Sequence, residues 1–98
     1  MTSARWTDSA RRDYRNIVEW LSERSPAAAT RIADTIDDRL AILATMPRMG
    51  RMGRLDGTRE LVISATPYIV VYQLEGEGDQ VIVLRVLHAA QRWPPKRS

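Results

Sequence analysis

Cysteine is absent from the 98 residues of this chain. Its absence excludes disulfide bonds, thiolate zinc sites and a cysteine nucleophile. The chain also has one histidine, His88, which excludes a metal site built from several imidazoles. We therefore expect neither a metal ion nor a cofactor.

Long apolar runs are missing as well. The apolar runs that are present, such as Tyr68–Tyr72 and Val81–Leu84, are far shorter than the ~20 residues that span a membrane. The first six residues lack the apolar centre of a signal peptide. We expect a cytoplasmic protein with no membrane partner.

The length and composition are typical of one small globular domain. Hydrophobic residues make up 44% of the chain and charged residues 28%, a balance that argues against disorder. We expect a single domain over residues 1–98 that ends in a short tail, residues 93–98.

The net charge of +3 is concentrated in the second half of the chain. Lys96 is the only lysine, and all the other basic residues are arginine. Four arginines gather between residues 48 and 59 and face only two acidic residues: Arg48, Arg51, Arg54 and Arg59 against Asp56 and Glu60. Guanidinium groups suit phosphates and carboxylates. This pattern predicts either a patch that binds an anionic partner, nucleic acid or an acidic protein segment, or a solvated loop that binds nothing.

Apolar periodicity predicts a helical hairpin over residues 8–46. Ala10, Tyr14, Ile17, Val18 and Leu21 follow a 3.6-residue period, with Thr7 or Asp8 as the cap. Ser25-Pro26 predicts the start of a second helix. Its stripe ends before Met46-Pro47 and comprises Ala29, Ile32, Ala33, Ile36, Leu40 and Leu43.

Strand character dominates the rest. Residues 4–7 are a candidate first strand, and Arg59–Ala65, Tyr68–Leu74 and Gln80–His88 are rich in Val, Ile and Tyr. The short connections favour an antiparallel meander, with Tyr68–Tyr72 in a central strand. The sequence therefore predicts an α+β fold of order (β)ααβββ, in which the helical hairpin packs on a small antiparallel sheet.

Few residues suit catalysis. Gly50, Gly53 and Gly57 precede a strand and not a helix, so they do not form a phosphate loop. His88 ends the last predicted strand, and Arg85 lies three residues before it, on the opposite sheet face. His88 is a candidate proton shuttle next to arginines that would stabilise phosphate charge. The alternative is a histidine that caps the strand by a hydrogen bond to the following turn.

Two tryptophans are candidate contacts for a protein partner. Trp20 falls beside the stripe of the first helix, so we expect it to border a groove outside the core, and Trp93 lies in the tail. Exposed tryptophans often anchor protein interfaces. The alternative is simple packing over the open end of the sheet.

Four segments in register resemble one family: Pro47–Arg51, Gly57–Leu61, Thr66–Tyr72 and Val83–His88. Together with the first helix and the Ser25-Pro26 hinge, they resemble the RelE/ParE superfamily of bacterial toxins over residues 5–93. The resemblance implies a growth-arresting toxin of a type II toxin–antitoxin pair. It also implies a cognate antitoxin with an acidic, amphipathic C-terminal segment, for which Trp20 and Trp93 are the candidate anchors.

The resemblance leaves three functions open. ParE-like members inhibit DNA gyrase, and the basic loop and the tail would then be contact surfaces. RelE-like members are metal-independent endoribonucleases that cleave mRNA on the ribosome; here Arg59 and Arg85 would hold phosphate and His88 would be the acid or base. The third is a non-catalytic binding module. Ribonucleases of this superfamily commonly carry arginine where this chain has Ile69, and tyrosine where it has Ala89. The ParE-like branch is therefore favoured.

Overall fold

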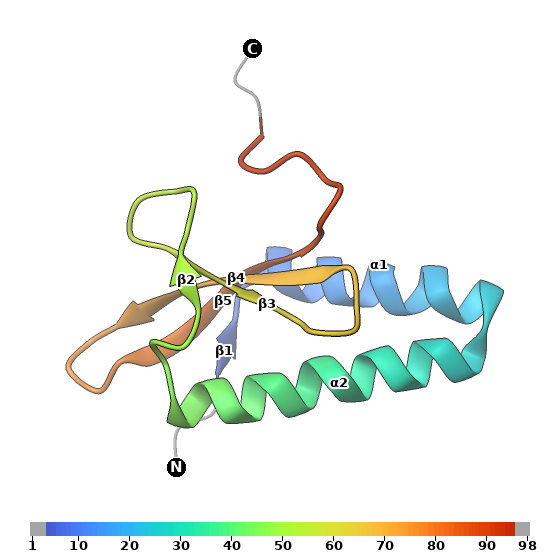
Figure 1. The fold of residues 1–98 in the computed structure, drawn as a ribbon, viewed down its shortest axis with the longest axis horizontal. Coiled ribbons are helices and arrows are strands. Elements are labelled where there is room, and N and C mark those ends of the chain that lie inside the picture. The colour runs from blue at the N-terminus through green and yellow to red at the C-terminus, as the bar shows by residue number, and fades with distance from the viewer. Residues whose placement is uncertain (1–3, 96–98) are drawn as a thin grey trace.

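The computed structural model describes residues 4–95 and confirms the helical hairpin (Figure 1). Helix α1 (Asp8–Arg24) begins where the Thr7 side chain accepts a hydrogen bond from the Ala10 amide. Helix α2 (Pro26–Thr45) begins one residue after α1 is closed by Ser25. The Ser25 amide donates to the Leu21 carbonyl, while its hydroxyl accepts from the Ala28 amide. One serine therefore ends the first helix and caps the second.

The sheet has five strands in the order β1-β5-β4-β3-β2. They are β1 (Arg5–Trp6), β2 (Arg51–Met52), β3 (Arg59–Val62), β4 (Tyr68–Glu75) and β5 (Gln80–His88). The α+β fold is thus confirmed, and β4 is the central strand. The strand expected over Arg59–Ala65 ends earlier than expected. Strand β3 stops at Val62, and Ala65 adopts a positive φ of 66° in the turn that follows.

Two features of the sheet differ from the expected antiparallel meander. Strand β1 pairs with β5 in parallel, so the sheet is mixed. The meander rule applies to strands joined by short connections, whereas β1 and β5 are separated by most of the chain. Strand β2 was expected to be loop. Its two residues pair with β3 through Arg51 opposite Glu60 and Met52 opposite Arg59, a pairing too short to leave a sequence pattern.

The hydrophobic core lies between the helices and one sheet face (Figure 1). From the sheet, Tyr68, Val70 and Tyr72 point into it. The helices contribute the predicted stripe, and its fully or nearly fully buried members are Ala10, Leu21, Ala29, Ile32, Ile36, Leu40 and Leu43.

The opposite sheet face is also buried along its centre. Ile69, Val71, Ile82 and Leu87 are each less than one-tenth exposed, yet they lie outside the helix-side cluster. This second face explains why Tyr68–Tyr72 is continuously apolar. We call it the far face, because it points away from the helices.

Neither helix in residues 4–95 combines the length and apolar character needed to cross a membrane. Within the same residues, no three acidic or imidazole side chains gather in a metal-binding arrangement. Residues 1–3 of the expected domain, and residues 96–98 of the expected tail with Lys96, lie outside the described part of the chain.

Candidate functional site

A row of charged residues crosses the far face of the sheet. Register places Arg51 of β2 opposite Glu60 of β3, Glu60 opposite Val71 of β4, and Val71 opposite Arg85 of β5. Residues paired in this way point to the same face. The sheet therefore places Arg51 and Arg85, which are 34 positions apart in the sequence, in one row on the same face.

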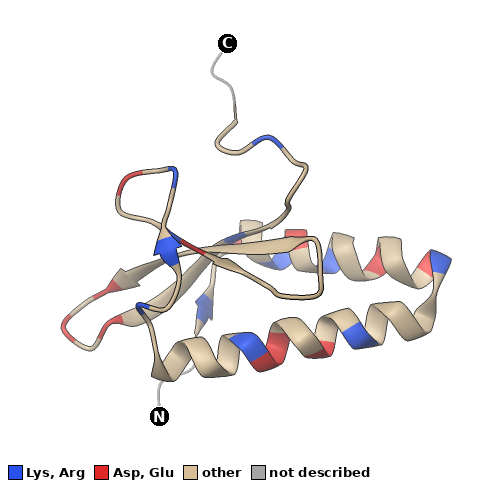
Figure 2. Ribbon diagram, in the orientation of Figure 1, with Lys and Arg blue, Asp and Glu red and all other residues tan. Residues whose placement is uncertain are grey.

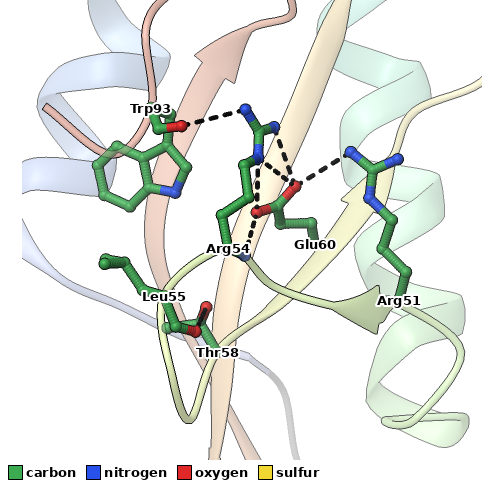
Figure 3. Close-up of polar contacts among 6 residues, drawn as sticks. All are labelled: Arg51, Arg54, Leu55, Thr58, Glu60 and Trp93. Carbon is green, nitrogen blue, oxygen red and sulfur yellow. Dashed lines mark hydrogen bonds and ion pairs between the residues drawn. The ribbon is translucent and has the colours of Figure 1, made fainter.

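Glu60 is the centre of this row, with only 1% of its surface exposed. Its carboxylate accepts hydrogen bonds from Nη2 of Arg51 at 3.0 Å and from Nη2 of Arg54 at 3.0 Å (Figure 3). It also accepts from the Arg54 backbone amide at 2.9 Å and from the Arg54 Nε. A buried carboxylate thus joins β3 to two guanidinium groups of the preceding segment.

Opposing effects set the charge of Glu60. Burial raises the pKa of its carboxyl group, but hydrogen bonds from the Arg54 side chain and amide and from Arg51 outweigh burial and lower the pKa to about 2. Glu60 is therefore ionised at neutral pH. It neutralises part of the positive charge that the sequence places in this loop.

The other two loop arginines have partners elsewhere. Arg48 forms a bidentate ion pair with Asp79 in the β4–β5 turn, with N–O distances of 2.5 and 3.2 Å. Arg59 donates to the backbone carbonyls of Arg48 and Gly50. Of the four arginines expected to form an anion-binding patch, the structure brings only Arg51 and Arg54 onto one carboxylate (Figure 2 shows the charged residues along the chain).

The tail residue Trp93 lies beside Arg54. Its carbonyl oxygen accepts a hydrogen bond from Arg54 Nη1 at 3.2 Å (Figure 3), and its ring lies 5.5 Å from the Arg85 guanidinium carbon. The side chain is half-buried. The packing alternative for Trp93 therefore describes its observed position, while its proposed contact with an antitoxin stays a prediction.

Arg85 forms an ion pair with Asp13, a residue that the sequence patterns did not single out. Its guanidinium bonds the Asp13 carboxylate of α1 at 2.6 and 3.1 Å, and the Val86 amide donates to the same carboxylate at 2.9 Å. The hydrogen bond to Asp13 raises the pKa of Arg85, against the effect of burial. One sequence feature could have indicated this contact. Asp13 is an acidic residue on the apolar stripe of the first helix, three residues after Ala10 and four before Ile17.

His88 has the geometry of a turn cap. Its Nδ1 accepts a hydrogen bond from the Ala90 amide at 3.0 Å, in the turn that follows β5. The ring packs edge-on against Tyr68, with centroids 5.6 Å apart. One of the two ring nitrogens is thus already an acceptor, which leaves less freedom for the proton-shuttle role.

Arg59 lies apart from the other two candidate catalytic residues. Arg59 is opposite Tyr72 and His88 is opposite Tyr68, so they share a face but are separated by four residues of β4, about 13 Å along a strand. Arg85 belongs to the far face. The structure therefore separates Arg59 from His88. Arg85 pairs with Asp13, and Asp13 lines the same shallow pocket as His88.

Trp20 borders a shallow groove that His88 also lines. Its side chain is 52% exposed and is stacked under Arg24, whose guanidinium carbon lies 3.8 Å from the ring centroid. The groove has a volume of about 310 Å³ and is lined by Asn16, Ile17, Trp20, Tyr68 and His88. The expectation that Trp20 lies beside a groove and outside the core is confirmed.

The arrangement of the helical hairpin and sheet is similar to that in two solved structures of toxin–antitoxin systems. The fold is similar to a structure of the chromosomal ParDE system from P. aeruginosa, with a TM-score of 0.77 and 22% identity, covering 90% of this chain and 96% of the other. It is also similar to the intact E. coli RelBE toxin–antitoxin complex, with a TM-score of 0.64 and 17% identity, covering 94% of this chain and 100% of the other.

Residues 4–93 match the family described as the ParE toxin of the type II toxin–antitoxin system parDE, and the chain belongs to that family. It is 39% identical over 90 residues to Y4kP of Sinorhizobium fredii, across 92% of this chain and 91% of the relative. It is 34% identical over 92 residues to the toxin RelE3 of Caulobacter vibrioides, across 94% and 99%. The expected RelE/ParE superfamily membership is confirmed, and the protein is a type II toxin of that superfamily.

Proposed function

We propose that this toxin arrests bacterial growth by inhibiting DNA gyrase and that a cognate antitoxin neutralises it. The observation that carries the proposal is that Arg59, Arg85 and His88 are each bonded to other groups of the chain, and that Arg59 lies about 13 Å along β4 from His88. Metal-free RNA cleavage needs a proton-transfer group and cations around one phosphate. Here Arg85 is paired with Asp13, Arg59 bonds backbone carbonyls, and His88 Nδ1 accepts a hydrogen bond from the Ala90 amide.

Inhibition of gyrase requires a contact surface and no reacting group. The match of residues 4–93 to the ParE family agrees with this proposal. The second candidate is RelE-like cleavage of mRNA, which is favoured by one observation, the 34% identity to relatives named RelE3 and RelE1. The third, a non-catalytic binding module, would show neither activity.

The test is a parallel assay of the purified toxin. One arm measures gyrase supercoiling of plasmid DNA, and the other measures cleavage of mRNA on translating ribosomes. We expect loss of supercoiling with intact mRNA, and the same inhibition by His88→Ala. Cleavage that is lost in His88→Ala or Arg85→Ala would instead identify a ribonuclease. Absence of both activities would leave the binding module.

The antitoxin partner is supported by the groove around Trp20. An amphipathic helix can place an apolar side chain against Ile17, Trp20 and Tyr68, while its acidic residues approach Arg24. Both structural neighbours come from toxin–antitoxin systems. The acidic character expected of the antitoxin segment fits the exposed guanidinium beside the groove.

Truncation of Trp20 tests this interface. Trp20→Ala is expected to weaken antitoxin binding by about 2 kcal/mol or more, because a large half-exposed aromatic ring at a groove is a typical energetic centre of an interface. The measurement is the dissociation constant by calorimetry, with Arg48→Ala as a comparison at an exposed arginine. A loss for Trp20→Ala below ~1 kcal/mol, or below that for Arg48→Ala, would show that Trp20 is not the anchor.

A further inference from the structure

Arg54 connects two segments that are far apart in the sequence. Its Nε and Nη2 bond the buried Glu60 carboxylate, and its Nη1 bonds the Trp93 carbonyl (Figure 3). A single guanidinium thus fixes the tail with respect to the loop between β2 and β3. Because its planar donors serve both partners at once, lysine cannot replace arginine in this role.

The loop itself is held by internal hydrogen bonds. The Gly53 amide donates to the Thr58 carbonyl at 2.8 Å, and the Thr58 hydroxyl donates to the Leu55 carbonyl at 2.6 Å. Leu55 is left 39% exposed next to Arg54. The loop therefore presents an apolar side chain and a guanidinium from a defined backbone.

Arg85 also lies close to the tail. Its guanidinium carbon is 5.5 Å from the Trp93 ring centroid, and the same group is paired with Asp13 of α1. The contacts therefore continue from the loop, through Trp93, to the first helix. We call the group formed by Arg51, Arg54, Leu55, Arg85 and Trp93 the loop–tail surface.

The charges of the loop–tail surface favour a protein partner. Glu60 and Asp13 offset two of its three guanidinium charges and leave one net positive charge. Nucleic-acid binding depends on several unpaired cations that contact phosphates. Exposed arginine beside Leu55 and Trp93 is the composition of a protein interface, in which an acidic segment supplies the complementary charge.

We propose that the loop–tail surface is the contact for an acidic segment of the toxin's target protein, and that Glu60 and Arg54 position it. The inference rests on the proposed function, which supplies gyrase as the target. Arg54 is both a contact and a positioning residue, whereas buried Glu60 acts only through the arginines that it holds.

The experiment compares Arg54→Lys with Asp79→Asn in the full chain. Arg54→Lys keeps the positive charge but loses the shared contact to Glu60 and Trp93. Asp79→Asn breaks the other loop ion pair, to Arg48, at a residue with a positive φ of 51° that asparagine tolerates. The concentration that halves gyrase supercoiling is expected to rise about tenfold for Arg54→Lys and to stay unchanged for Asp79→Asn.

A second measurement reports the tail position independently of activity. Fluorine NMR of the 5-fluorotryptophan-labelled toxin gives signals from Trp6, Trp20 and Trp93, and Trp93→Phe assigns the last. Arg54→Lys is expected to shift the Trp93 signal, and Asp79→Asn is not. A shifted signal with unchanged inhibition would overturn the loop–tail surface and leave the proposed function intact. An unshifted signal would overturn the positioning role of Arg54.

The remaining outcomes separate the two proposals. A wild-type toxin that leaves supercoiling intact would overturn the proposed function, and with it gyrase as the target of this surface. Wild-type binding to a short DNA duplex without gyrase, weakened in Arg54→Lys, would overturn the assignment to an acidic protein segment. Inhibition by the wild type that Arg54→Lys weakens, with no duplex binding, supports both proposals.

Discussion

Replacing Arg51 and Arg54 together with alanine is expected to lower the free energy of unfolding by about 3–5 kcal/mol at neutral pH. The reason is that Glu60, 1% exposed, would remain in the sheet as a buried carboxylate without a counter-charge. Urea unfolding followed by circular dichroism measures the effect. The two arginines are about half exposed, so their own loss of packing contributes little.

A third substitution distinguishes this cause from a general effect of the loop. Adding Glu60→Gln to the double variant removes the buried charge and should recover most of the lost stability. The destabilisation of the Arg51/Arg54 double variant should also be smaller at acidic pH. The pKa of Glu60 is lowered in the folded state, so the stability from its ionised form is complete above its ordinary pKa and is lost as the pH falls toward about 2. A double variant as stable as the wild type at pH 7 would refute the role of the ion pairs.

Gly50→Ala is expected to destabilise the fold by about 2–3 kcal/mol. A Cβ atom at this position would lie 2.5 Å from the Tyr72 hydroxyl oxygen and 3.0 Å from the Glu60 carbonyl oxygen. Neither atom can move easily. The Tyr72 hydroxyl donates to the Pro47 carbonyl and accepts from the Gly50 amide, and the Tyr72 ring is fully buried. Thermal and urea unfolding of the variant measure the cost.

A double-mutant cycle with Tyr72→Phe identifies the mechanism. Tyr72→Phe leaves the Pro47 carbonyl and the Gly50 amide without this partner, at a cost of about 1–3 kcal/mol. Both single variants disrupt the same hydrogen bond, so the double variant should be less destabilised than their sum by at least about 0.5 kcal/mol. Gly78→Ala is the control, because a Cβ there meets no atom within 4 Å. Strict additivity, or an equal loss in Gly78→Ala, would argue against the close contact.

Local sequence patterns were sufficient to predict the helices and the central strands. The caps Thr7 and Ser25 act within a few residues, and the stripe from Ala29 to Leu43 repeats with the period of a helix. Such signals need no knowledge of distant partners. Local patterns did not predict the short strand β2 or the parallel pairing of β1. A two-residue strand forms because the neighbouring strand pairs with it, and that neighbour is distant in the sequence for β1.

The candidate site was only partly predictable. The sequence placed Trp20 next to a groove and offered both roles for His88, one of which, the turn cap, matches its contact with the Ala90 amide. It gave no sign that Glu60 would hold Arg51 and Arg54, or that Asp13 would hold Arg85. These partners meet through strand register and through the packing of α1 against β5, across separations of up to 72 residues.

The sequence by itself thus determined the helical hairpin, the order of the longer strands, the core-facing residues and the surplus of arginine in the second half of the chain. Only the tertiary structure decided which of those arginines are neutralised and which remain available at the surface. The physical reason is that the energy of an ion pair depends on the distance between the two charges in space, and that burial changes the free-energy contribution of each charge. The periodicity of a sequence predicts the face of the helix or strand on which a residue lies, but it does not predict which distant residue that side chain contacts.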